Sequence, residues 1–330
     1  MEIVAEVRRG ELIESYHWGS VAVVYSDGNL RYFYGKPHMY IHTRSSMKPF
    51  QALLPFITGA IEKFDITDEE IAVICASHNG TDYHRDLVLN ILKKAGFTEE
   101  DLECGVHMPY DKETADRLIR EGQKPTPVRN NCSGKHAGML ISARAMGVDH
   151  RGYRFPHHPV QEKIREIIHS FVGEKPIYEG IDGCGVPVFA LPLMDLAYMY
   201  ALLADPEKSP YPEYLSRIQK AMKAFPVAVA GIGRFDTDLM EKVPMIVAKA
   251  GAEAVYGVAI PQKKMGLAVK IHDGGRRAVA PVVMKALDTI GILTDDIKDA
   301  LRDYAMPPVK NNHGETVGHI HATYNLIDGN

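Results

Sequence analysis

The stretch Thr43-Arg44-Ser45-Ser46-Met47-Lys48-Pro49-Phe50-Gln51 places a serine and a lysine three residues apart, at the start of an apolar run from Phe50 to Ile61. The run predicts a helix that Pro55 kinks, and residues i and i+3 of a helix lie on one face about one turn apart. The Lys48 amine could then take the proton of the Ser45 hydroxyl and make it a nucleophile. The stretch therefore indicates a Ser–Lys catalytic pair. The structural alternative is Ser45 as a helix N-cap and Lys48 in solvent.

The composition sets broad limits on what the protein is. The chain has 330 residues, 45% hydrophobic and 24% charged, with a net charge of −4, so it can bury one large core or two smaller ones. Positive and negative residues are interspersed, so the sequence gives no sign of a basic surface that would bind nucleic acid or an anionic membrane. No apolar run approaches the roughly 20 residues of a membrane span, and the first residues lack a signal peptide's apolar segment. The cysteines are widely spaced, which favours reduced thiols. We expect a cytoplasmic globular protein.

Strands are expected at both ends of the chain and helices between them. Two β-branched and aromatic runs flank the turn residues Ser26-Asp27-Gly28-Asn29, which predicts a hairpin. Three short apolar runs in the last third predict an antiparallel meander. Helical periodicity marks the middle of the chain and one segment near the end. The expected strands are 20–25, 30–34, 245–249, 255–260 and 266–271, and the main expected helices are 82–94, 112–121, 137–146, 159–171, 193–203, 213–224 and 279–292.

This order predicts an α/β class with an antiparallel sheet flanked by helices and a mostly helical lobe inserted into it. The α/β lobe is expected to comprise residues 1–65 and 225–330, and the helical lobe residues 66–224. The whole chain is expected to form a single catalytic unit.

Other loops rich in small and polar residues can carry chemistry. They are Ala76–Gly80, Asn130–His136 and Asp182–Gly185, and Lys249-Ala250-Gly251 adds a lysine at a strand end. A lysine-x-glycine strand that follows an S-x-x-K helix is the arrangement of β-lactamases and penicillin-binding enzymes. Gly231-Ile232-Gly233-Arg234 is too short to be a dinucleotide fingerprint.

Five segments, taken together, identify a family resemblance. T-R-S-S-M-K-P-F-Q, A-S-H-N-G, N-N-C-S-G-K-H-A-G-M, G-I-D-G-C-G-V-P and V-A-K-A-G-A-E follow one another in the order found in the asparaginase II family, the rhizobial-type or class 3 L-asparaginases. The resemblance covers nearly the whole chain. It implies a fold related to serine β-lactamases and β-lactamase-like glutaminases, and a homodimer.

The resemblance also implies roles for individual residues. Ser45 matches the nucleophile and Lys48 its base, while Ser77 matches a second active-site serine with Lys249 as its partner. Two Ser–Lys pairs leave open which serine attacks first. The residues implied to bind substrate are Arg44, His78, Asn79, Asp182 and Gly251.

A zinc site is the third implication of the resemblance. Cys132, Lys135 and Cys184 match the family's metal-binding positions. Two thiolates suit zinc, but a lysine must lose a proton before it can coordinate, and from chemistry alone His136 is the more obvious third ligand. The alternative is that the two cysteines are structural. Zinc here would orient or polarise the substrate, since serines are available as nucleophiles.

The expected function is hydrolysis of the side-chain amide of L-asparagine by a Ser–Lys acyl-enzyme mechanism. A glutaminase, or an amidase for β-lactams or peptides on the same scaffold, is the nearest alternative. A non-catalytic protein that binds an amino acid or zinc is the alternative from a different class.

Overall fold

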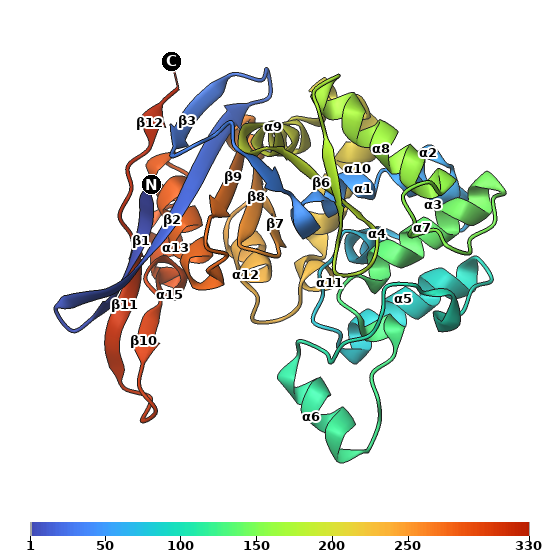
Figure 1. Ribbon diagram of the computed structural model, residues 1–330, viewed down its shortest axis with the longest axis horizontal. Coiled ribbons are helices and arrows are strands. Elements are labelled where there is room, and N and C mark those ends of the chain that lie inside the picture. The colour runs from blue at the N-terminus through green and yellow to red at the C-terminus, as the bar shows by residue number, and fades with distance from the viewer. Residues whose placement is uncertain (1, 330) are drawn as a thin grey trace. The chain divides into compact units, whose positions relative to one another are not determined.

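The computed structural model describes residues 2–329, which form two compact units (Figure 1). The first unit contains the chain up to Ser46, residues 190–208 and the chain from Asp238 onward. The second contains residues 47–189 and 209–237.

The first unit is built on a nine-stranded antiparallel sheet in which the two ends of the chain lie side by side. β1 (Ile3–Arg9) pairs with β2 (Leu12–Tyr25) on one side and with β11 (Thr316–Ala322) on the other. Figure 1 shows this as a blue strand beside a red one. The strand order is β10 (Pro308–Lys310), β11, β1, β2, β9 (Met265–Ile271), β8 (Val255–Ile260) and β7 (Val247–Gly251), while β3 (Leu30–Tyr34) pairs with β2 and with β12 (Ile327–Asp328). The predicted hairpin and meander are confirmed.

Helix α9 (Leu193–Ala204) covers one face of this sheet at very close range. A Cβ at Gly266 would lie 2.0 Å from the Ala197 carbonyl oxygen, and a Cβ at Gly257 would lie 2.1 Å from the Tyr200 ring. Only glycine allows the helix this close to the strands. Every residue of β8 is buried, so the opposite face is covered as well, and α13 (Val279–Thr289) packs against β8, β9, β1 and β11. The predicted α/β class is confirmed.

The apolar run after Lys48 does not form one helix. It forms three separate turns, α1 (Lys48–Gln51), α2 (Leu54–Ile57) and α3 (Ala60–Lys63). Pro55 lacks the N–H that a continuous helix needs, and Gly59 adopts a left-handed conformation with φ of 71°. The prediction of a helix over Phe50–Ile61 is therefore wrong in its continuity.

The second unit is organised around α7 (Ser133–Met146). Eleven consecutive residues of this helix, from Ser133 to Ala143, are buried, as expected of a helix enclosed on all sides. It packs against α2, α3, α4, α5 and α8. The other helices of this unit are α4 (Asp68–Ile74), α5 (Asp82–Lys94), α6 (Lys112–Arg120), α8 (Pro159–Val172), α10 (Pro212–Ala224) and α11 (Pro226–Val229).

The two units differ in extent from the lobes expected from the sequence. Residues 190–208 join the sheet unit because α9 packs on β2, β8 and β9, and the turns α2 and α3 join the helical unit because they pack on α7. The remaining elements are β4 (Tyr40–His42), which pairs with residues 190–192 of β6 (Pro187–Pro192), and β5 (Tyr178–Ile181), α12 (Phe235–Lys242), α14 (Asp295–Ala300) and α15 (Arg302–Ala305). Across residues 2–329, no helix combines the length and the apolar character needed to cross a membrane.

Candidate active site

Lys48 is a buried lysine whose amine is surrounded by hydrogen-bond partners. Its Nζ lies 2.5 Å from the Ala76 carbonyl oxygen, 3.0 Å from Ser77 Oγ and 3.2 Å from Cys132 Sγ. Only 1% of its surface is exposed, and the N-cap of α1 is Met47 rather than Ser45. The alternative of a capping serine and a solvated lysine is therefore wrong. Lys48 is in direct contact with Ser77, the serine for which the family resemblance implies Lys249 as the partner lysine.

The backbone around Ser77 is fixed from two directions. The Ser77 N–H donates to the Val229 carbonyl at 3.0 Å, which ties the loop to α11, and the His78 N–H donates to the Asn131 carbonyl at 3.2 Å. The Arg129 guanidinium donates to the Gly80 carbonyl at 2.9 Å. The main chain on both sides of the Ser77 hydroxyl is thus held before any substrate binds.

His78 and His84 form a stacked pair beneath this loop, with ring centroids 4.8 Å apart. The Gly80 N–H donates to His78 Nδ1, so in the neutral ring Nε2 carries the proton and donates to Ser133 Oγ at 2.9 Å. In the same way His84 Nε2–H donates to the Val227 carbonyl at 2.9 Å. Burial lowers the pKa of His84 to about 4, so this ring is neutral at physiological pH.

The thiols of Cys132 and Cys184 form a coupled pair beside Lys135. Lys135 Nζ lies 3.2 Å from Cys184 Sγ. A hydrogen bond from the Cys132 thiol, helped by the charge of Lys135, lowers the pKa of Cys184 well below its usual value. The same hydrogen bond, together with burial, raises the pKa of Cys132. The Cys184 thiol therefore loses its proton more readily than the Cys132 thiol.

The protonation of Lys135 follows from its neighbours. Burial by itself lowers the pKa of Lys135, but the charge of Cys184, followed by those of Cys132 and Asp182, raises it above its usual value. The Asp182 carboxylate also accepts the Gly183 N–H at 2.9 Å, which fixes the turn before Cys184. These neighbours favour the ammonium form of Lys135 beside the two thiols.

The donor set fits a zinc ion in its chemistry. Two sulfurs and an amine nitrogen lie close together, and the pKa of one of the thiols, Cys184, is lowered. Within residues 2–329 no three His, Cys, Asp or Glu side chains gather as a metal site, so His136 does not join the two cysteines. Its Nδ1 lies 2.6 Å from the Tyr153 hydroxyl, and its buried Nε2 has no partner within the described chain. Lys135 would have to supply the nitrogen ligand.

The first unit holds the other residues singled out by the sequence. Arg44 has φ of 50°, a left-handed conformation that costs energy for a residue with a side chain. A Cβ at Gly251 would lie 3.1 Å from the Thr43 carbonyl oxygen, so β7 runs directly along the segment that carries Ser45. Lys249 is fully buried, lies opposite Gly257 in the sheet, and donates to the Ala250 carbonyl at 2.8 Å.

Asn79 is already bound within the second unit. Its amide nitrogen donates to the Ile232 carbonyl at 3.3 Å, and its oxygen accepts from Arg234 at 2.9 Å. Sequence patterns do not mark Arg234, His84 or Arg129 as members of the site. No local motif connects them to Ser77, because each reaches its partner through tertiary packing.

The comparisons with known proteins identify the family. The family model for L-asparaginase II matches residues 5–322, and the chain belongs to this family, as the sequence resemblance predicted. Membership implies an asparaginase-type hydrolase that acts on amides. No curated protein matches the chain.

Solved structures that match the chain are distant in sequence. A putative β-lactamase from Bacteroides dorei DSM 17855 is 12% identical with a TM-score of 0.39, over 82% of this chain and 93% of that one. An octameric penicillin-binding protein homologue from Pyrococcus abyssi is 15% identical with a TM-score of 0.42, over 82% of this chain and 73% of that one.

Proposed function

We propose that the protein is an L-asparaginase that hydrolyses the side-chain amide of L-asparagine to L-aspartate and ammonia. The observation that carries this proposal is the contact between Lys48 Nζ and Ser77 Oγ at 3.0 Å, in a chain that belongs to the L-asparaginase II family. A buried amine beside a serine hydroxyl is the arrangement that activates serine for acyl transfer.

In the proposed reaction, a serine Oγ attacks the carboxamide carbon while neutral Lys48 accepts the hydroxyl proton. A neutral amine has two N–H donors and one lone pair. If the Ala76 carbonyl and Cys132 Sγ accept these two N–H groups, the lone pair of the neutral amine faces the Ser77 hydroxyl, whose oxygen lies 3.0 Å from Nζ. Lys48 then gives the proton to the departing nitrogen, which leaves as ammonia. Water, deprotonated by the same amine, cleaves the ester to L-aspartate and restores the serine.

The first nucleophile is either Ser45 or Ser77. Resemblance to the family favours Ser45, with Lys249 assisting Ser77, whereas the hydrogen bond from Lys48 favours Ser77. Trapping the acyl-enzyme by rapid acid quench and mass spectrometry separates the two. The true nucleophile, changed to alanine, forms no acyl-enzyme, while loss of the other serine slows the reaction but leaves the adduct. An adduct in both single variants removes the Ser–Lys acyl-enzyme mechanism from the proposal.

Substrate class is tested by comparing turnover of L-asparagine, L-glutamine and a chromogenic β-lactam by the wild-type protein. The proposal expects kcat/KM for L-asparagine to exceed the others by at least about tenfold. Preference for L-glutamine or the β-lactam would establish an alternative amidase. Ligand binding without any turnover would favour a non-catalytic binding protein.

We also propose that Cys132, Lys135 and Cys184 hold a zinc ion. The contact between Lys135 Nζ and Cys184 Sγ at 3.2 Å and the hydrogen bond between the two thiols support this, since they place two sulfurs and an amine close together. A bound zinc would supply a Lewis acid that orients the substrate. Zinc can bind only when Cys132 and Lys135 have lost their protons, so zinc affinity should increase as pH rises.

A homodimer and a cytoplasmic location are further proposals. The first rests on family resemblance and the second on composition and cysteine usage. Multi-angle light scattering of the purified protein tests the dimer, and a monomer at micromolar concentration would contradict it.

A further inference from the structure

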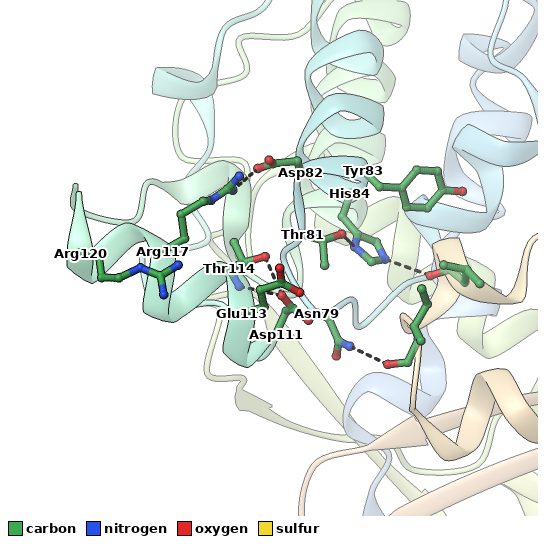
Figure 2. Close-up of a pocket in the computed structure, with 12 residues that line it drawn as sticks. Asn79, Thr81, Asp82, Tyr83, His84, Asp111, Glu113, Thr114, Arg117 and Arg120 are labelled. Atoms are coloured by element: carbon green, nitrogen blue, oxygen red, sulfur yellow. Dashed lines mark hydrogen bonds and ion pairs between the residues drawn. The ribbon is translucent and has the colours of Figure 1, made fainter. Parts of the chain in front are cut away.

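A cavity of about 470 Å³ opens on the helical unit, and its lining includes neither Lys48 nor Ser77 (Figure 2). Its walls come from the Asn79–His84 segment, from α6 with its N-cap, and from the chain near Val227 and Ile232. The volume lies within the range of about 300–1,000 Å³ that is usual for small-molecule sites. The cavity is large enough for a ligand of amino-acid size.

One wall of the cavity carries charges of both signs. Glu113, Arg117 and Arg120 have i, i+4, i+7 spacing, which places them on a single face of α6. Arg117 is bound to Asp82 at 2.8 Å, as Figure 2 shows. Over residues 2–329, the Glu113 carboxylate and the Arg120 guanidinium form neither a hydrogen bond nor an ion pair. These two charged groups remain for a ligand.

The facing wall is polar but already satisfied. The Asn79 amide is bound to Ile232 and Arg234, and both ring nitrogens of His84 are bound to Thr81 and Val227. The Asp82 carboxylate of the same segment is already paired with Arg117 and Arg129. Recognition therefore depends on a carboxylate and a guanidinium on α6.

We propose that this cavity binds a free α-amino acid, with the ligand's carboxylate on Arg120 and its ammonium on Glu113. A guanidinium matches a carboxylate with paired N–H donors, and an ammonium needs an anionic acceptor. A ligand with only one of these charges leaves one of the two protein groups unpaired.

The cavity is joined to the candidate active site through its satisfied wall. Asn79 follows Ser77 by two residues, and His84 stacks on His78 with centroids 4.8 Å apart. Because this wall is continuous with the loop that holds Ser77, a ligand that contacts the wall changes the surroundings of Ser77, and its binding free energy is linked to turnover. The link to turnover rests on the proposed function. So does the choice of L-aspartate as the probe, because L-aspartate is the product of the proposed reaction.

The experiment is calorimetric titration of the full-length protein with L-aspartate. One binding event should weaken at least tenfold in Arg120→Ala and in Glu113→Gln, which change exposed side chains and should leave the fold intact. Lys112→Ala, a change of an exposed residue on the same helix outside the cavity lining, should bind as the wild type does. Succinate, which lacks the ammonium, should bind the Arg120-dependent site at least tenfold more weakly than L-aspartate.

Two results would overturn the proposal: no Arg120-dependent binding of L-aspartate at millimolar concentration, or equal binding of succinate. Failure of the proposed function gives a different pattern. In that case the wild-type protein releases no ammonia from L-asparagine, yet the Arg120-dependent binding event persists.

Discussion

Lys48 Nζ and Ser77 Oγ are 3.0 Å apart, although 29 positions separate the two residues in the chain. The same amine contacts the Ala76 carbonyl and Cys132 Sγ, so a single lysine joins the serine loop to the thiol pair. Any change in the charge of Lys48 is therefore felt by both, because the group is buried and poorly screened by water.

The first prediction concerns the base. Lys48→Met retains most of the volume but removes the amine, and we expect the rate of ammonia release from L-asparagine to fall by at least about 100-fold, as is usual when a general base is lost. Steady-state kinetics measure this, with circular dichroism to verify folding. Lys63→Met, an exposed change in the same unit, is the control. Activity within threefold of wild type in Lys48→Met would exclude Lys48 as the base.

The second prediction concerns acid stability. The folded-state pKa of His84 is lowered to about 4, so between this value and about 6.5 the unfolded chain binds a proton that the folded protein does not. The stabilisation is complete above pH 6.5 and is lost as pH falls. Titration of His84 alone should lower the free energy of unfolding by about 2 kcal/mol when the pH falls from 7 to 5.

Urea unfolding at the two pH values measures this effect. His84→Gln should lose less stability than wild type over the same interval, by about 2 kcal/mol. His313→Gln, at an exposed position, should behave as wild type. Equal pH dependence in all three proteins would show that His84 titrates alike in the folded and unfolded chains.

The third prediction concerns the packing of α7. A Cβ at Gly134 would lie 2.0 Å from the Val73 carbonyl oxygen, so Gly134→Ala forces α4 and α7 apart. Helix propensity alone favours alanine by about 1 kcal/mol, whereas overpacking of this kind costs about 3 kcal/mol. We expect net destabilisation in urea unfolding. Gly183→Ala, where nothing lies within 4 Å of the added Cβ, is the matched control. A stabilised Gly134→Ala variant would contradict the observed packing.

The fourth prediction concerns the metal. Protein purified without chelators should carry about one zinc per chain by elemental analysis, and Cys184→Ser should carry less than about a tenth of that, because one of the two sulfur ligands is lost. Cys75→Ala, outside the thiol pair, should keep the zinc of the wild type. Absence of stoichiometric metal from the wild-type protein at neutral pH would remove the zinc proposal.

The sequence by itself determined the features that depend on neighbours along the chain. Turn residues at Ser26–Asn29 set the hairpin, and period-3.6 patterns set helices such as α5 and α8. Short motifs predicted Ser45, Lys48, Ser77 and the two cysteines as candidate reactive side chains. These signals are local: the turns and helices form through hydrogen bonds between residues that are close in the sequence, whichever part of the protein the segment packs against.

Only the tertiary structure decided which of these groups meet. Spacing suggested that Lys48 serves Ser45, yet its amine hydrogen-bonds to Ser77, because the packing of α4 against α7 brings the loop after Cys75 to the lysine. The expected helix after Lys48 is interrupted at Pro55 and Gly59. Within residues 2–329, His136 does not form a metal-binding group with Cys132 and Cys184. A lysine side chain extends several ångströms and can reach partners on any packed neighbour, so its partner is set by the packed core and not by sequence spacing.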